Sequence, residues 1–217
     1  MEYGHGGDIY RNRNVELDFS VNVNPLGMPD FVWEAAQRSI TFCTRYPDSS
    51  CGKLRERMAK ITGVPEDQMI FGNGAAELIF RLVQEVKPKK AVIPVPSFAE
   101  YEAALRSCGT ELAFFYLKEA ESFFLNVTEF LGFLKTEQPE IVFLCTPANP
   151  TGAMIRQADL VKILDHCKKN GILLVLDECF VEFLDEERSG GCIQKFLDWK
   201  TGRPENGGTL FLLRAFT

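Results

Sequence analysis

Residues 171–177 read GILLVLD, a run of five apolar residues that begins after a glycine and ends at the carboxylate of Asp177. A segment without a polar side chain on either face is typical of a strand in a parallel sheet that helices cover on both sides. Short apolar runs of the same kind recur along most of the chain. They are QMIFG (68–72), KAVIPV (90–95), ELAFFYL (111–117), EIVFLCT (140–146) and TLFLLRA (209–215).

The segments between these runs carry apolar residues at helical spacing, so strand and helix alternate along the chain. We therefore predict an α/β fold, a three-layer sandwich with helices on both faces of a mostly parallel sheet. Residues 1–50 are rich in Gly, Asn and Pro and are expected to form an irregular N-terminal arm ahead of one large domain, 51–217. Such sheets bind ligands at the carboxyl ends of their strands. The predicted helices are 52–62, 75–86, 98–107, 127–135 and 156–170.

Composition argues against several kinds of partner. The net charge is −6 and no basic cluster stands out, so we expect no nucleic acid. The start MEYGHGGDIY lacks the features of a signal peptide, and no apolar run nears the ~20 residues that cross a bilayer, so we expect a cytoplasmic protein without a membrane partner. The seven cysteines form no CxxC pair and are expected to be reduced. The only histidines, His5 and His166, lie at no ligand spacing from a cysteine, so no metal site is predicted.

A glycine-rich turn, GNGAAE (72–77), follows the first apolar run and leads directly into a predicted helix. The first N–H groups of a helix have no partner within it, so those of Ala75, Ala76 and Glu77 would face any anion held at the turn. A phosphate group is the natural occupant. The alternative is a plain tight turn in which Asn73 caps the helix.

Two other strand ends carry residues suited to a binding site. The segment PSFAEY (96–101) places Phe98 and Tyr101 at the start of the next helix, facing the crevice at the carboxyl ends of the strands. The alternative is that both side chains pack in the core. In PANPTG (147–152), Asn149 lies between two prolines that fix its direction. That frame suits a hydrogen bond of fixed orientation, although a plain loop has the same composition.

Asp177 is the first polar residue after five apolar ones, which predicts a semi-buried carboxylate that keeps a ring nitrogen protonated, or else a helix cap. The motifs GNGAAE, PSF and NPTG, then Asp177, then LRAFT, occur in an order that resembles the fold type I pyridoxal-phosphate enzymes of aminotransferase classes I and II. The resemblance covers nearly the whole chain. It implies pyridoxal 5'-phosphate as the cofactor and the aminotransferase large domain as the fold.

The resemblance also implies roles for the strand-end residues. In the family the glycine-rich turn holds the cofactor phosphate and an aromatic residue stacks on the ring. An amide side chain bonds the ring hydroxyl group and a carboxylate bonds the ring nitrogen, and these two are the predicted catalytic residues. The matching positions are, in that order, Gly74 with Ala75 and Ala76, then Phe98, Asn149 and Asp177.

Further cofactor contacts are implied near the chain end and in the arm. Phe180 stands where many relatives have a tyrosine that contacts the cofactor, and Ala215 replaces a common serine. Thr217 matches a residue of the cofactor site, and the Schiff-base lysine of the family would follow it. We therefore expect a large domain that is incomplete at residue 217, with the small C-terminal domain absent. Tyr46 resembles the tyrosine that reaches the cofactor of the neighbouring subunit, which implies a homodimer.

The arm sequences HGGDIY and LDFSVNVNPLGMP resemble those of the threonine-phosphate decarboxylases of cobalamin synthesis. From composition alone, the first of them would be expected to form a flexible terminus. By that match His5, Gly6 and Asn22, together with Asn149, contact a small phosphorylated substrate. The expected reaction is decarboxylation of L-threonine O-3-phosphate to aminopropanol phosphate. The alternatives are a histidinol-phosphate or related class I/II aminotransferase, and a non-catalytic binding module built on the same cofactor fold.

Overall fold

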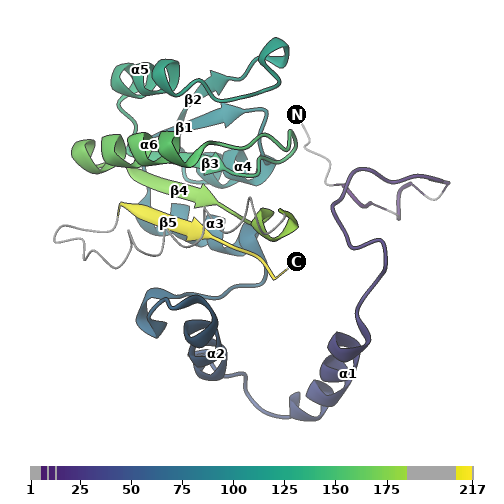
Figure 1. Ribbon diagram of the computed structural model, residues 1–217. Coiled ribbons are helices and arrows are strands. Elements are labelled where there is room, and N and C mark those ends of the chain that lie inside the picture. The colour runs from purple at the N-terminus through teal and green to yellow at the C-terminus, as the bar shows by residue number, and fades with distance from the viewer. Residues whose placement is uncertain (1–5, 9, 13, 185–208, 217) are drawn as a thin grey trace. The chain divides into compact units, whose positions relative to one another are not determined.

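The computed structural model describes residues 6–8, 10–12, 14–184 and 209–216, and within them it contains one sheet (Figure 1). Its strands are β1 Lys90–Val95, β2 Glu111–Tyr116, β3 Ile141–Cys145, β4 Leu173–Asp177 and β5 Leu210–Leu213. They lie in the order β2-β1-β3-β4-β5, and every neighbouring pair is parallel. The predicted α/β class with a mostly parallel sheet is therefore confirmed.

Helices cover both faces of this sheet, as the three-layer prediction requires. They are α3 Ala75–Val86 and α4 Ala99–Ser107 on one face, and α5 Val127–Glu137 and α6 Gln157–Asn170 on the other. Successive strand residues point to opposite faces, so each strand contributes to both layers of core. Toward α5 and α6 point Val92, Val142, Leu144, Leu174 and Leu176; toward α3 and α4 point Ala91, Ile93, Ile141, Phe143 and Val175. Each fully buried Val, Leu, Ile or Phe side chain among them contributes about 1.5–3 kcal/mol.

Short sequence signals set the helix ends. The side chain of Asn126 accepts hydrogen bonds from the N–H groups of Thr128 at 3.1 Å and Glu129 at 3.3 Å, which begins α5. Gly171 ends α6 in the left-handed conformation, with φ 66°. The five predicted helices are all present, and their bounds differ from prediction by two residues at most. Among the described residues, no helix combines the length and apolar character needed to span a bilayer.

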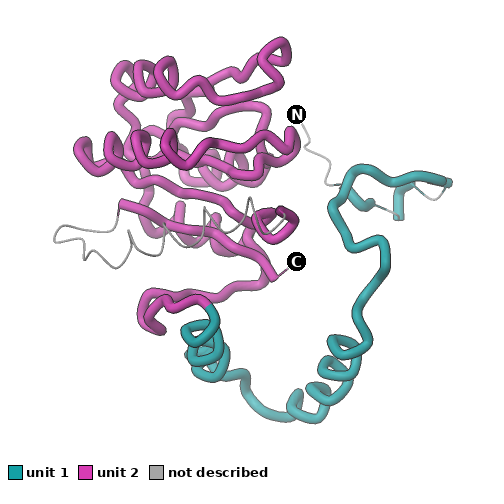
Figure 2. Tube along the Cα trace, in the orientation of Figure 1, with its two compact units in different colours: residues 1–61 teal, residues 62–217 magenta. Residues whose placement is uncertain are grey.

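The chain divides into two units, residues 1–61 and residues 62–217 (Figure 2). Unit 2 contains the whole sheet. Unit 1 contains α1, Asp30–Ser39, and nearly all of α2, Gly52–Thr62. Within the described chain no residue of either helix is buried.

The arm is not irregular throughout, because α1 lies within it. Pro29 precedes the helix in an extended conformation, Asp30 lies in the first turn and Arg38 in the last. Acidic residues at the start and basic residues at the end both interact favourably with the helix dipole. The sequence did not predict this helix, because the Gly-, Asn- and Pro-rich composition of residues 1–50 indicated an irregular arm. The end signals of the helix are weaker, and none of its residues packs into a core.

The segment QMIFG (68–72), predicted as a strand, is not one. Met69 has extended backbone angles, φ −116° and ψ 140°, but no described strand pairs with residues 69–72. A strand requires a hydrogen-bonded neighbour, and an apolar run does not specify whether one is present.

Candidate active site

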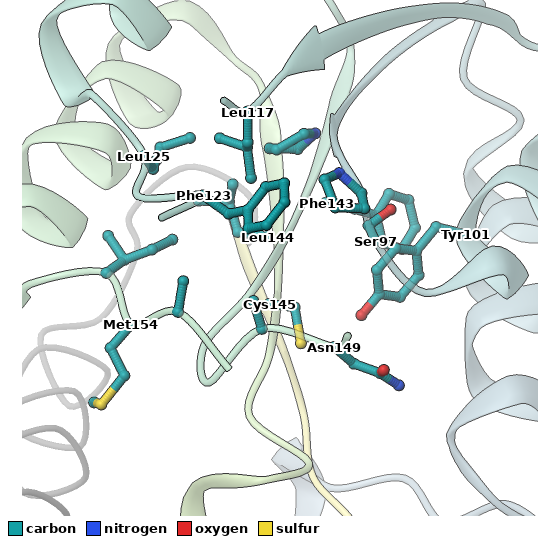
Figure 3. A pocket seen from close by; sticks show the side chains of 15 residues that line it. Ser97, Tyr101, Leu117, Phe123, Leu125, Phe143, Leu144, Cys145, Asn149 and Met154 are labelled. Atoms are coloured by element: carbon teal, nitrogen blue, oxygen red, sulfur yellow. The ribbon is translucent and has the colours of Figure 1, made fainter. Parts of the chain in front are cut away.

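The carboxyl ends of β1, β3 and β4 meet at one edge of the sheet, because all three strands run in the same direction. The register of β3 and β4 pairs Cys145 with Asp177 at this edge. A cavity of about 40 Å³ lies beside them and is lined by Tyr101, Cys145 and Asn149 together with apolar side chains such as Leu117 (Figure 3). In Figure 3 the Tyr101 hydroxyl group, the Cys145 thiol and the Asn149 side chain lie on the same side of this cavity.

Asp177 is buried at the end of β4, with 4% of its surface exposed. Its Oδ2 atom accepts a hydrogen bond from the Tyr101 hydroxyl group at 2.5 Å, and its Oδ1 atom accepts one from the backbone N–H of Cys179 at 2.9 Å. The second bond closes a turn of the kind that aspartate forms with the residue two positions later. Asp177 thus closes a local turn rather than capping a helix, because Phe180 is the N-cap of the helical turn that follows. It also makes a long-range contact, with Tyr101.

Three titratable groups surround this carboxylate. Burial and then the charge of Asp177 raise the pKa of Tyr101 far above its ordinary value. The same causes, in the same order, raise the pKa of Cys145 to about 12 and also raise the pKa of Cys179. All three groups keep their protons near neutral pH, so the phenol acts as a donor toward the carboxylate.

The glycine-rich turn presents the N-terminus of α3. Gly74 is the N-cap, with φ 86°, and no side chain caps the helix. Asn73 is therefore not the cap; instead its backbone N–H donates to the Glu77 carboxylate at 2.5 Å. A Cβ atom added to Gly74 would meet no atom within 4 Å, so space is open above the turn. The N–H groups of Ala75 and Ala76 are suited to hold an anion there.

Phe98 is the N-cap residue of α4 and is half-buried. Its ring meets the ring of Tyr101 edge-on, with centroids 5.6 Å apart and planes at 84°. Core packing, the alternative reading, describes Tyr101 well, since that residue is 1% exposed. Phe98 packs partly against the same core and keeps part of its ring accessible.

Asn149 lies in a loop that is fixed at both ends. The N–H of Thr146 donates to the Asp177 carbonyl at 2.9 Å, and the Thr146 hydroxyl group accepts from the N–H of Ile155 at 3.1 Å. Within the loop, the N–H of Gly152 donates to the Ala148 carbonyl at 2.7 Å. The half-buried Asn149 side chain is thereby held at the cavity rather than on a free loop.

The structure gives fewer contacts for the remaining predicted site residues. Phe180 is half-buried three positions after Asp177, and its ring lies 5.9 Å from that of Phe183. Asn22 and Tyr46 belong to unit 1 and are exposed there, Tyr46 completely.

Gly6 also belongs to unit 1. A Cβ atom at this position would come within 2.0 Å of the Ser20 carbonyl oxygen, and Gly7 N–H donates to the Ser20 hydroxyl group at 2.8 Å. Gly6 and Gly7 of the first arm motif therefore lie against Ser20 of the second. His5 and Thr217 lie outside the described residues. Among the residues that are described, no group of three or more His, Cys, Asp or Glu side chains could hold a metal ion.

Sequence reasoning missed a buried ion pair beside the site. Glu178 is 1% exposed, and Arg214 donates to it through Nε at 3.1 Å and Nη2 at 2.6 Å. The available signal was a second carboxylate directly after the strand-end Asp177, followed much later by an arginine at the end of another apolar run.

The family model for aminotransferase class I and II matches residues 14–198. A threonine-phosphate decarboxylase of Salmonella typhimurium is 38% identical over 190 residues, which cover 84% of this chain and 52% of that protein. The chain spans about half the length of the curated relatives it matches.

Solved structures resemble the described fold closely. L-threonine-O-3-phosphate decarboxylase from Porphyromonas gingivalis is 25% identical with a TM-score of 0.72, over 91% of this chain and 54% of that one. Histidinol-phosphate aminotransferase from Clostridium acetobutylicum is 27% identical with a TM-score of 0.74, over 92% of this chain and 55% of that one.

Proposed function

Because this chain belongs to the aminotransferase class I and II family, we propose that it binds pyridoxal 5'-phosphate and decarboxylates L-threonine O-3-phosphate to aminopropanol phosphate. The observation that carries the proposal is the buried carboxylate of Asp177 at the edge where the strands end. The uncapped N-terminus of α3 faces the same edge, because α3 leads into the start of β1. A buried carboxylate and an anion-binding helix end suit the two charged groups of the cofactor, its protonated ring nitrogen and its phosphate.

The donor set fits three polar groups of this cofactor, namely its phosphate, its ring hydroxyl group and its ring nitrogen. Ala75 and Ala76 would hold the phosphate, the Asn149 amide would bond the ring hydroxyl group and Asp177 would bond the ring nitrogen. The half-buried ring of Phe98 offers an aromatic surface for stacking. We propose Phe180, Gly74 and Thr217 as further cofactor contacts.

When bound, pyridoxal phosphate supplies an electron sink for a carbanion formed at the substrate Cα. The residues of this chain prepare the site for that chemistry. Asp177 would hold a proton on the ring nitrogen, and Asn149 would hydrogen-bond the ring hydroxyl group. Phe98 would stack on the ring and exclude water, which would strengthen the charged contacts in the site.

The decarboxylase is favoured over its relatives by the arm. Gly6 and Gly7 of one arm motif contact Ser20 of the other, which supports a common role for the two motifs. We propose that His5, Gly6 and Asn22 contact the phosphorylated substrate, together with Asn149. The similarity to a histidinol-phosphate aminotransferase structure supports that aminotransferase as the second candidate.

The arm also supports a proposal about assembly. Residues 1–50 would supply substrate and dimer contacts, and residues 51–217 the large cofactor-binding domain. Tyr46 would reach the cofactor phosphate of the neighbouring subunit in a homodimer, which agrees with its complete exposure in its own unit. We propose a cytoplasmic location for the enzyme.

The test uses the intact gene product. Purified protein should be yellow, lose its colour on borohydride reduction and release carbon dioxide from threonine phosphate. Amine transfer from glutamate to the keto partner of histidinol phosphate, without carbon dioxide release, would replace the proposal by its second candidate. Colourless protein that takes up no added pyridoxal phosphate would refute both.

A further inference from the structure

Tyr101 is a buried residue of α4 to which the proposed function assigns no role. It is 1% exposed, and its hydroxyl group donates to Oδ2 of Asp177 over 2.5 Å. The two residues lie 76 positions apart in the sequence. The contact therefore joins the first turn of a covering helix to the carboxyl end of β4.

Aromatic neighbours hold the Tyr101 ring on two sides. It stacks on Phe143 of β3 with centroids 4.9 Å apart and planes at 25°, and it meets Phe98 edge-on. A ring packed in this way cannot rotate freely, so its hydroxyl group has a fixed direction. Tyr101 thus contacts both the proposed stacking residue and the proposed partner of the ring nitrogen.

The hydrogen bond bears directly on the state of Asp177. Burial alone favours a protonated carboxyl group, whereas hydrogen bonds donated to the charged form favour the carboxylate. Tyr101 donates to Oδ2 and the N–H of Cys179 donates to Oδ1. Each carboxylate oxygen can accept more than one donor, so both bonds leave capacity for a ring N–H.

We propose that Tyr101 is a positioning residue: its hydroxyl group fixes the direction of the Asp177 carboxylate and keeps it ionised, so that the carboxylate can hold a proton on the ring nitrogen. The inference rests on the proposed function, because that function makes the ring nitrogen the partner of Asp177. Without the hydroxyl group, the buried carboxylate loses one of the two hydrogen bonds described for it.

The other groups near Asp177 do not replace this donor. Cys145 of β3 and Cys179 of the loop after β4 face it as neutral thiols, which are weak donors. From the end of β5, Arg214 donates to the neighbouring Glu178. The Cys179 thiol also bonds Asp177, but the strong side-chain donor is the Tyr101 hydroxyl group at 2.5 Å.

The first test measures the carboxyl group in cofactor-free protein. Tyr101→Phe keeps the ring and removes the hydroxyl group; Tyr116→Phe, at a tyrosine that is 74% exposed, is the matched control. Carbon-13 NMR of labelled aspartate carboxyl groups reports the surroundings of each carboxylate, and Asp177→Asn identifies the resonance. Tyr101→Phe should move the Asp177 resonance, because it removes the donor to Oδ2, and Tyr116→Phe should leave that resonance in place. An Asp177 resonance at the same position in wild type and Tyr101→Phe would overturn the inference.

The second test uses the cofactor-loaded intact protein. With ring-labelled nitrogen-15 pyridoxal phosphate, the ring nitrogen should lose its proton at lower pH in Tyr101→Phe than in wild type. Turnover should fall about tenfold in Tyr101→Phe, and this loss should vanish when Asp177 is already Asn. Fully additive losses would overturn the inference.

A failure of the proposed function can be told apart from a failure of this inference. Wild-type protein that binds no pyridoxal phosphate would refute the function. The carboxyl NMR measurement needs no cofactor, so it still decides whether the Tyr101 hydroxyl group bonds and positions the Asp177 carboxylate.

Discussion

Arg214 donates two hydrogen bonds to Oε2 of Glu178, the residue that follows the strand-end Asp177. The backbone N–H of Glu178 in turn donates to the carbonyl of Leu213 at 3.0 Å. These side-chain and backbone hydrogen bonds therefore connect the carboxyl ends of β4 and β5. Because Glu178 is buried and Arg214 is 29% exposed at its side chain, the carboxylate is the member of the pair that depends on its partner.

Arg214→Ala should lower the free energy of unfolding by about 3 kcal/mol, because it removes the cation that compensates a buried carboxylate. The matched control is Arg106→Ala, which breaks an exposed pair with Glu102 on α4 and should cost less than about 1 kcal/mol. Urea denaturation followed by circular dichroism measures both. Equal losses in the two variants would contradict a special role for the pair between Arg214 and Glu178.

Asp177→Asn should lower turnover by about 10²-fold while leaving substrate affinity nearly unchanged. The substitution keeps the shape but removes the negative charge, whose effect is realised mainly as charge develops in the transition state. Asparagine can still accept the N–H of Cys179, so stability should stay nearly level. Steady-state kinetics of carbon dioxide release, with melting curves, separate the two effects. Unchanged turnover would leave Asp177 only its role in closing the local turn.

Much of this site follows from the sequence, because parallel strands bring their carboxyl ends to one edge. The apolar run before Asp177 placed that residue at the edge, and the loop after β3 placed Asn149 beside it. The glycine-rich turn likewise predicted the start of α3 correctly. Each of these is a property of a few neighbouring residues.

The contacts that the sequence did not reveal join residues far apart along the chain. Nothing near Tyr101 indicates that its hydroxyl group reaches a carboxylate 76 positions later. The same holds for Arg214 and Glu178, which lie 36 positions apart. The wrong prediction of a strand at 68–72 has the same cause, because strand pairing depends on a neighbouring strand that the local sequence pattern does not specify.

Tyr46→Phe should weaken cofactor retention without changing the stability of the fold. The side chain is completely exposed within its unit, so removing its hydroxyl group disturbs no described packing. If it bonds the cofactor phosphate of the neighbouring subunit, the dissociation constant for pyridoxal phosphate should rise about 10- to 100-fold. Absorbance titration of the intact protein measures this.

The control for Tyr46 is Tyr10→Phe, because Tyr10 is an exposed tyrosine of the same unit, 83% accessible. It should leave cofactor affinity unchanged. Sedimentation of the wild type supplies an independent check, since the role of Tyr46 requires a dimer. A fully active monomer would exclude that role.

Asp159 lies at the start of α6, and its contribution to the free energy of unfolding should depend on pH. It is buried in the first turn of the helix, and its carboxylate accepts from Lys162 at 2.9 Å and from Arg156 at 2.7 Å. The hydrogen bond from Lys162, followed by the bond from Arg156, lowers the pKa of Asp159 below its usual 3.8, against the opposing effect of burial. A group whose pKa is lower in the folded state stabilises the fold above its unfolded pKa, and that stability is lost as pH falls through the folded value.

Asp159→Asn should therefore cost about 1 kcal/mol near neutral pH, as expected for a carboxylate at a helix start. The cost should shrink as pH falls below 3.8 toward the lower pKa of the folded state, because the unfolded chain takes up a proton at Asp159 before the folded protein does. Asp165→Asn, on the exposed side of the same helix, is the matched control and should have a small effect at every pH. Urea denaturation of the three proteins between about pH 7 and about pH 3 measures the difference. A cost of Asp159→Asn that stays constant over this range would show that the charge of Asp159 does not stabilise α6.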